Sequence, residues 1–229
     1  MDTDAYVKEQ LALAYPSSTF PMTIRCVRDG IILADEYLSS TAFMLTPVGL
    51  DLRGNLRRAA ISFKIHELCT KGDLPFSTTM PKMERANWHQ LEIRSGKCVG
   101  YLTRTEEEGG FPEDRPSRQD ERLRNQGDLF QPNVVALNES ALNISAWLTW
   151  RADRKGNLLH LCWGAPAADV DEWLGFSNLL KTAAHDLPVV TSSADMTSPD
   201  PKERMRFREE VAEKLNRRND DDDAANDNK

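Results

Sequence analysis

The clearest hydrophobic pattern in the chain is helical and lies in its N-terminal half. Between Asp51 and Thr70, apolar residues recur along two adjacent stripes at the spacing of a helix face. The stripes are Leu56, Ala60 and Phe63, and Ile61, Ile65 and Leu68. Ile61, Phe63 and Ile65 also alternate with polar residues as a strand would, but the length of the pattern favours a helix. Two stripes predict a helix buried over a broad face, ending at Lys71-Gly72.

Alternating apolar and polar positions predict two hairpins further along the chain. The first has strands at 90–95 and 98–105, joined by a turn at Gly96-Lys97. The second has strands at 142–150 and 159–163, joined by a turn at 153–157. Weaker patterns predict helices at 5–14 and 166–181 and a short strand at 23–27, whereas 31–45 is ambiguous. The polar residues between the two hairpins predict a long surface loop.

These elements predict an α+β fold. We expect an antiparallel sheet of at least four strands, with helices packed on one face. The two hairpins belong to one layer in this prediction and bury Ile93, Ile144, Leu148 and Leu161 beneath the helices. Residues 1–190 form a single domain. Residues 191–229 read as a Ser/Thr/Asp/Pro linker, a short charged helix and an acidic, disordered tail.

Composition places the chain among globular proteins, with 40% hydrophobic and 28% charged residues out of 229. The first residues are acidic and the apolar run that follows them is short, so we expect neither a secretory signal nor a membrane span and place the protein in the cytoplasm. The four cysteines are dispersed singly, which predicts reduced thiols.

Charge argues against a nucleic-acid partner. The net charge is −7, whereas nucleic-acid binders usually carry a strongly basic face. Only residues 49–126 have more basic than acidic residues, and only slightly. A folded surface can still gather those bases on one side.

No familiar catalytic signature is present in the sequence. The phosphate-binding glycine loops, the zinc-protease helix and the hydrolase nucleophile motif are all missing. His160 and Cys162 would share a strand face, but a structural zinc needs four ligands and no second pair has matching spacing, so no metal is predicted.

One cluster suggests a hydrolytic alternative. Glu92 and Arg94 on the first hairpin, with Asp73 before them, loosely resemble the carboxylates and base of metal-dependent PD-(D/E)xK nucleases. In such an enzyme the carboxylates would hold Mg²⁺, the one cofactor that this alternative requires. Arginine stands where those nucleases have lysine, and it does not exchange a proton at neutral pH. A solvated ion pair on the strand is the competing interpretation.

Other residues suggest binding. Trp147 falls on the polar side of its strand, and an apolar ring there indicates an interface through the sheet face. Trp88 and Arg94 are further candidate binding residues. In the tail, Arg204, Arg206 and Arg208 precede the acidic run, as in a segment that folds on a partner. A small-ligand sensor with a tryptophan-lined pocket between sheet and helix is a third alternative.

Three stretches carry a resemblance to known proteins: Leu56-Arg-Arg-Ala59, Gly72-Asp-Leu-Pro-Phe76 and Asn87-Trp-His-Gln-Leu-Glu-Ile-Arg94. In them the chain resembles uncharacterised bacterial proteins from toxin–antitoxin-like or phage-defence gene neighbourhoods. The resemblance implies a context and assigns no catalytic residue. Together with the missing signatures, it predicts a non-catalytic component that works by binding another protein, through the sheet face or the tail.

Overall fold

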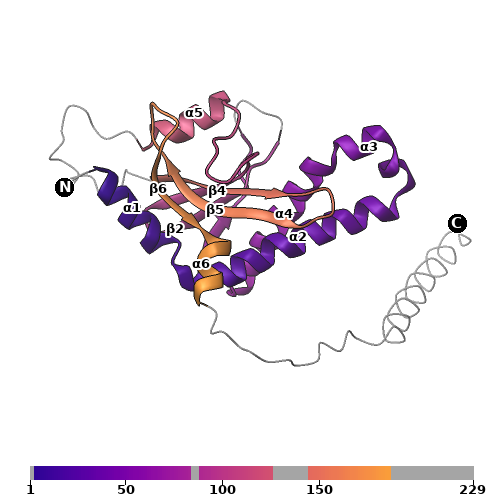
Figure 1. Ribbon diagram of the computed structural model, residues 1–229, viewed down its shortest axis with the longest axis horizontal. Coiled ribbons are helices and arrows are strands. Elements are labelled where there is room, and N and C mark those ends of the chain that lie inside the picture. Colours follow the sequence, from indigo (N-terminus) through magenta and orange to yellow (C-terminus); the bar gives the residue numbers. More distant parts are fainter. Residues whose placement is uncertain (1–2, 84–87, 126–143, 187–229) are drawn as a thin grey trace, which may run out of the picture. The chain divides into compact units, whose positions relative to one another are not determined.

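A computed structural model describes residues 3–83, 88–125 and 144–186 of the chain. The chain divides after Pro188, and all of the described residues belong to the unit Met1–Pro188 (Figure 1). Its helices are α1 (Thr3–Ala14), α2 (Phe20–Ser40), α3 (Pro47–Asp51), α4 (Arg53–Lys71), α5 (Pro116–Leu123) and α6 (Leu179–Asp186), with short 3-10 turns η1 (Ser17–Thr19) and η2 (Ala42–Leu45). Its strands are β1 (Ser77–Thr79), β2 (Glu92–Ser95), β3 (Cys98–Arg104), β4 (Ile144–Ala152), β5 (Leu158–Pro166) and β6 (Trp173–Asn178).

The strands form one six-stranded sheet in the order β1-β2-β3-β4-β5-β6. Both predicted hairpins are present, as β2–β3 and β4–β5, and they lie in the same layer as expected. One prediction needs correction, because β3 and β4 run parallel and the sheet is therefore mixed. Parallel neighbours need a long crossover, and the chain between residues 105 and 143 supplies it.

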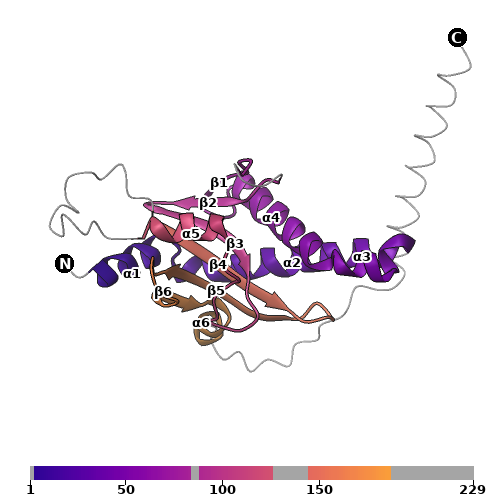
Figure 2. The same cartoon turned by 90° about the horizontal axis from the view of Figure 1, so that it is seen from above.

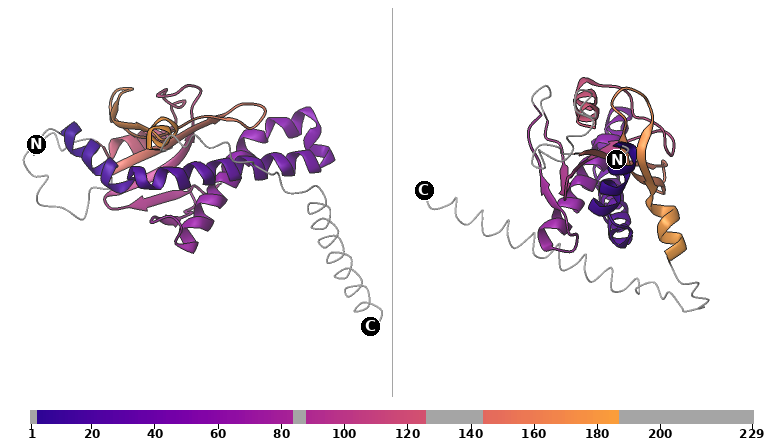
Figure 3. Two further views of the ribbon diagram at one scale, coloured as in Figure 1. Left: turned by 60° about the horizontal axis from the view of Figure 1, so that its bottom comes forward. Right: turned by 90° about the vertical axis from the view of Figure 1, so that its left-hand side faces the viewer.

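One face of the sheet packs against α1, α2, α4 and α6. The core between these layers contains Ile93, Ile144, Leu148 and Leu161, the four residues expected there. The predicted helix at 51–70 is α4, which ends at Gly72 in the left-handed conformation (φ 82°) that glycine adopts most readily. Figure 3 shows that the long α2 extends away from the sheet toward α3.

Helical cover is not confined to that face, contrary to the prediction. The segment after β3, including α5, packs on the opposite face, above the strands in Figure 1 and in front of them in Figure 2. A second small core of Val99, Tyr101 and Trp147 lies there, with Phe111 and Trp173 against it. The polar region expected to be a long surface loop therefore covers the sheet.

Two element predictions were wrong. The expected strand at 23–27 lies inside α2, because Ile24, Val27 and Ile31 continue one buried helical stripe. The expected helix at 166–181 is instead strand β6 followed by α6. Its helical spacing of apolar residues is equally compatible with an edge strand that pairs with β5 from Cys162 to Pro166.

Some predictions concern residues outside the described ranges, namely the tail from 191 onward and the start of the second hairpin at 142–143. Among the helices of the described ranges, none combines the length and the apolar character that crossing a membrane requires.

Candidate functional site

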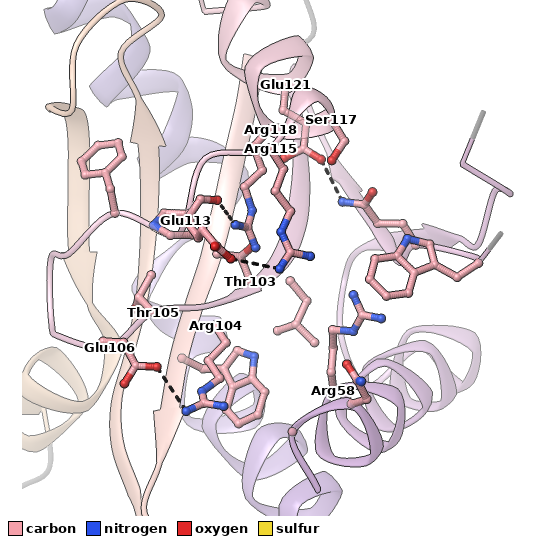
Figure 4. A pocket seen from close by; sticks show the side chains of 18 of the residues that line it. Arg58, Thr103, Arg104, Thr105, Glu106, Glu113, Arg115, Ser117, Arg118 and Glu121 are labelled. Carbon is pink, nitrogen blue, oxygen red and sulfur yellow. Dashed lines mark hydrogen bonds and ion pairs between the residues drawn. The ribbon is translucent and has the colours of Figure 1, made fainter. Parts of the chain in front are cut away.

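A cavity of about 580 Å³ opens where α4, β3 and the segment 105–121 meet. Four arginines line it, and Figure 4 shows Arg58, Arg104, Arg115 and Arg118 around the same space. They come from three separate parts of the chain, so the site exists only in the folded domain. Cavities of this size accommodate small ligands.

The fold turns Arg58 toward the cavity through its neighbour on α4. Arg57 is buried and points toward α2, where its Nε and Nη2 donate to both Asp35 carboxylate oxygens at 2.9 and 2.6 Å. Its Nη1 donates to the Asp153 carbonyl at 2.7 Å. Successive helix residues point about 100° apart, so anchoring Arg57 against α2 leaves Arg58 facing the cavity.

The first turn of α5 places two further arginines. Arg115 precedes the helix and Arg118 lies three positions later, which puts both side chains on one side of the turn. Arg118 donates to the Glu113 carbonyl, and Arg115 Nη2 donates to the Glu113 carboxylate at 3.1 Å. Arg104, at the end of β3, donates to Glu106 at 3.2 Å.

Four acids also line the cavity, and three of them have partners. Glu113 pairs with Arg115, and Glu106 pairs with both Arg104 and Arg151. Glu121 accepts from Gln90 at 2.9 Å and from Trp147 Nε1 at 2.7 Å. Burial raises the pKa of Glu121. Asp51 is exposed at the end of α3.

Neither Arg58 nor Arg118 forms a salt bridge among the described residues, although the Glu121 and Glu113 carboxylates partly offset the charge of Arg118. Burial, followed by the charge of Arg115, lowers the pKa of both guanidinium groups. Arginine nevertheless stays protonated in proteins, so three positive groups repel one another across the cavity. Such an arrangement favours binding of an anion.

An aromatic wall adjoins the arginines. The guanidinium of Arg58 lies 4.1 Å from the centre of the Trp88 ring, in a cation–π contact. Backbone hydrogen bonds from Met83 N to Trp88 O (3.0 Å) and from Gln90 N to Pro81 O (3.1 Å) hold this wall in place. The Trp88 side chain is 38% exposed, so part of the ring is accessible.

A hydroxyl and an imidazole also meet near the cavity. Thr105 Oγ1 lies 2.9 Å from His160 Nε2, and both residues are buried. Burial lowers the pKa of His160. The Glu108 carboxylate acts on His160 through its charge, but among the described residues no carboxylate is hydrogen-bonded to the ring as in a catalytic triad. We interpret Thr105 and His160 as a mutually satisfied interior pair.

The residues of the nuclease alternative lie on β2 and just after α4. Glu92 and Arg94 do meet, at 2.5 Å between Oε2 and Nη2, and Thr79 also donates to that carboxylate. Asp73 is exposed just after α4, and no described contact joins it to Glu92. Within the described ranges, no three histidine, cysteine or acidic side chains gather as a metal site would require.

The predicted binding residues differ in where the structure places them. Trp147 does lie on the face opposite Leu148, but it is only 1% exposed because α5 and Phe111 cover it. It therefore belongs to the second core and offers no surface to a partner. Trp88 lines the cavity, whereas Arg94 is an exposed strand residue away from it. Arg204, Arg206 and Arg208 lie outside the described residues.

Comparison with known protein families, with curated proteins and with solved structures finds no match for this chain. The arguments for function therefore rest on the geometry of the chain itself.

Sequence reasoning did not identify Arg58, Arg104, Arg115 or Arg118 as site residues. The only available signal was the slight excess of basic residues in 49–126. It could not show that side chains from α4, β3 and α5 converge, because that depends on how the crossover segment folds back on the sheet.

Proposed function

We propose that this protein is a non-catalytic binding domain whose cavity takes an oxyanion group of its ligand. The observation that carries the proposal is the convergence of Arg58, Arg115 and Arg118 on one cavity, where Arg58 and Arg118 form no salt bridge among the described residues. This develops the small-ligand alternative from the sequence. It replaces the expected apolar pocket with a charged one.

The chemistry of guanidinium supports an oxyanion ligand. Its planar fork of N–H donors matches the oxygens of phosphate, sulfate or carboxylate, and charge-assisted hydrogen bonds of this kind are the strong ones. Partial burial of Arg58 and Arg118 reduces competition from water. A ligand with several anionic oxygens can contact more than one guanidinium and relieve their mutual repulsion.

Inorganic phosphate tests the site directly. We expect it to bind the wild-type protein and Arg58→Ala to weaken binding about tenfold, since one charge-assisted hydrogen bond contributes ~1.5 kcal/mol or more. Titration calorimetry at constant ionic strength measures this. Arg25→Ala is the matched control, because Arg25 is an exposed arginine of α2 outside the cavity.

Equal affinities for wild type and Arg58→Ala would show that any phosphate binding occurs elsewhere. An equal loss of phosphate affinity in Arg25→Ala would show that the effect arises from the net charge of the protein alone. Either result contradicts the proposal.

A protein partner, the first expectation from sequence, is a second candidate supported by a different surface. We call the C-terminal half of α2, η2 and α3 (residues 32–52) the helical arm. Seven large apolar residues of the arm are between 40% and 72% exposed: Ile32, Tyr37, Phe43, Leu45, Val48, Leu50 and Leu52. Exposed apolar residues that cluster indicate an interaction surface. The toxin–antitoxin-like or defence context stays a hypothesis resting on the resemblance.

Substitution on the arm tests this candidate. We expect Phe43→Ser/Val48→Ser to abolish retention of a partner purified with the wild-type protein from cells that produce it. The free energy of unfolding should change by less than ~1 kcal/mol, because both side chains are exposed. Arg58→Ala serves as the control that keeps the arm intact. Unchanged retention in the arm variant, measured by quantitative pull-down, argues against a partner at this surface.

A further inference from the structure

The volume of the cavity and its aromatic wall say more about the ligand than its charge does. A single tetrahedral oxyanion fills only a fraction of about 580 Å³. Besides its charged groups, the lining includes the aromatic and aliphatic side chains of Trp88, Leu102, Phe111 and Trp150. The ligand therefore has a body as well as an anionic group.

Trp88 and Arg58 define the shape of surface that this body meets. The guanidinium carbon of Arg58 lies over the Trp88 ring, 4.1 Å from its centre. Trp88 Nε1 donates to Met83 Sδ at 2.9 Å, which favours one orientation of the indole. Trp88 is 38% exposed, so part of this aromatic residue is accessible beside the guanidinium groups.

Flat aromatic and guanidinium surfaces bind flat rings. Bases stack on tryptophan and on arginine without regard to base identity, because every base has a π-face. Polar groups near the stack, among them Asn55 and Gln90 in the lining, offer donors and acceptors to the edge of such a ring. A phosphate placed among Arg58, Arg115 and Arg118 would leave an attached ring within the same cavity.

We infer that the ligand of this cavity is a nucleotide-like phosphoester, in which the phosphate meets the arginine cluster and a planar heterocycle stacks beside Trp88. The inference rests on the proposed function, because it needs the same arginines. Beyond the oxyanion, the inference specifies that the rest of the ligand includes a planar heterocycle. A mononucleotide fits it better than a polynucleotide, because the cavity gathers four acids with its four arginines and the chain as a whole is acidic.

Two matched ligands test the phosphate site and the ring-binding surface separately. Adenosine 5′-monophosphate and ribose 5-phosphate carry the same phosphate, and only the first has a planar heterocycle. We expect calorimetry to show that the nucleotide binds wild-type protein at least about fivefold more tightly, the low end of what one stacked base contributes. Ribose 5-phosphate should bind about as well as inorganic phosphate.

Variants at Trp88 test whether this residue causes the preference for the nucleotide. Trp88→Leu should remove the preference for the nucleotide over ribose 5-phosphate, whereas Trp88→Phe should retain part of it. Arg58→Ala should weaken both ligands, although it also removes a neighbour of Trp88. Thermal unfolding of each variant verifies that the domain remains folded.

Each outcome has a distinct meaning. Equal binding of the two ligands overturns the ring inference while the oxyanion site stands. Absence of binding by nucleotide, ribose 5-phosphate and inorganic phosphate alike overturns both. A short single-stranded oligonucleotide that binds far more tightly than the mononucleotide, through Trp88, identifies a polynucleotide partner and overturns the mononucleotide assignment.

Discussion

Replacing Arg57 with alanine is expected to lower the free energy of unfolding by about 3 kcal/mol, the low end of the range for breaking a buried ion pair. Arg57 is 4% exposed and makes three hydrogen bonds, two to Asp35 and one to the Asp153 carbonyl. The substitution removes the cation from the partly buried Asp35 carboxylate and one of the two N–H groups that donate to the Asp153 carbonyl. Chemical denaturation of purified wild type and variant measures the difference.

The Asp35 side chain is 30% exposed, so water can partly compensate when Arg57 is lost. A double-mutant cycle isolates the pair from the packing of the arginine stem. Arg57→Met, Asp35→Ala and the double variant should show a coupling energy of at least ~1.5 kcal/mol, within the range for side chains in direct contact. A coupling energy near zero would mean that the ion pair contributes nothing and that Arg57 acts only by filling space.

The ion pair between Arg57 and Asp35 also affects the candidate site. Arg57 and Arg58 are adjacent on α4, and the anchor that holds the first against α2 orients the second toward the cavity. Buried ion pairs often contribute less to stability than apolar residues would. Here the pair specifies the rotation of a helix that carries a ligand-binding residue, which gives it a role beyond stability.

Local patterns along the chain predicted the elements that local physics decides. The stripes of α4 and the alternation in β2, β3, β4 and β5 are properties of neighbouring residues, and all five elements are confirmed. The burial of Ile93, Ile144, Leu148 and Leu161 followed from the same alternation. Helix 166–181 failed because its apolar spacing suits either structure, and pairing with β5 decided in favour of a strand.

The candidate site lay beyond such reasoning for a physical reason. Its arginines are polar residues in a polar region, and nothing local distinguishes them from solvated surface. Trp147 shows the same limit of local patterns for a buried residue, because its polar neighbours in the sequence indicated that it would be exposed. Asn125 bonds to Ser145 and Glu121 bonds to Trp147, so polar groups of the crossover bury that face by satisfying one another.

Gly30 is the second position at which a single substitution should disrupt the domain. A Cβ placed on it would lie 2.6 Å from Ile61 Cα and 2.7 Å from Ile61 N. Carbon atoms in contact prefer separations of about 3.5–4.0 Å. The obstacle is the backbone of α4, so no rotamer change can relieve the clash and the two helices must move apart.

Helix propensity and packing predict opposite signs for Gly30→Ala, which makes the experiment decisive. Alanine in place of glycine within a helix stabilises by up to ~1 kcal/mol. Overpacking typically costs 1–3 kcal/mol, and we expect a net loss of about 2 kcal/mol for alanine and more than ~3 kcal/mol for Gly30→Val. Denaturant titration of both variants measures the free energy of unfolding.

Gly54→Ala is the matched control, because it is also a helical glycine but its added Cβ would meet only the end of the Arg104 side chain, at 3.3 Å. We expect that variant to be as stable as wild type or slightly more so. A neutral or stabilised Gly30→Ala protein would mean that α2 and α4 do not approach as closely as described. The position of Arg58 would then lose its basis, since the same crossing of α2 and α4 brings Arg57 to Asp35 and turns Arg58 into the cavity.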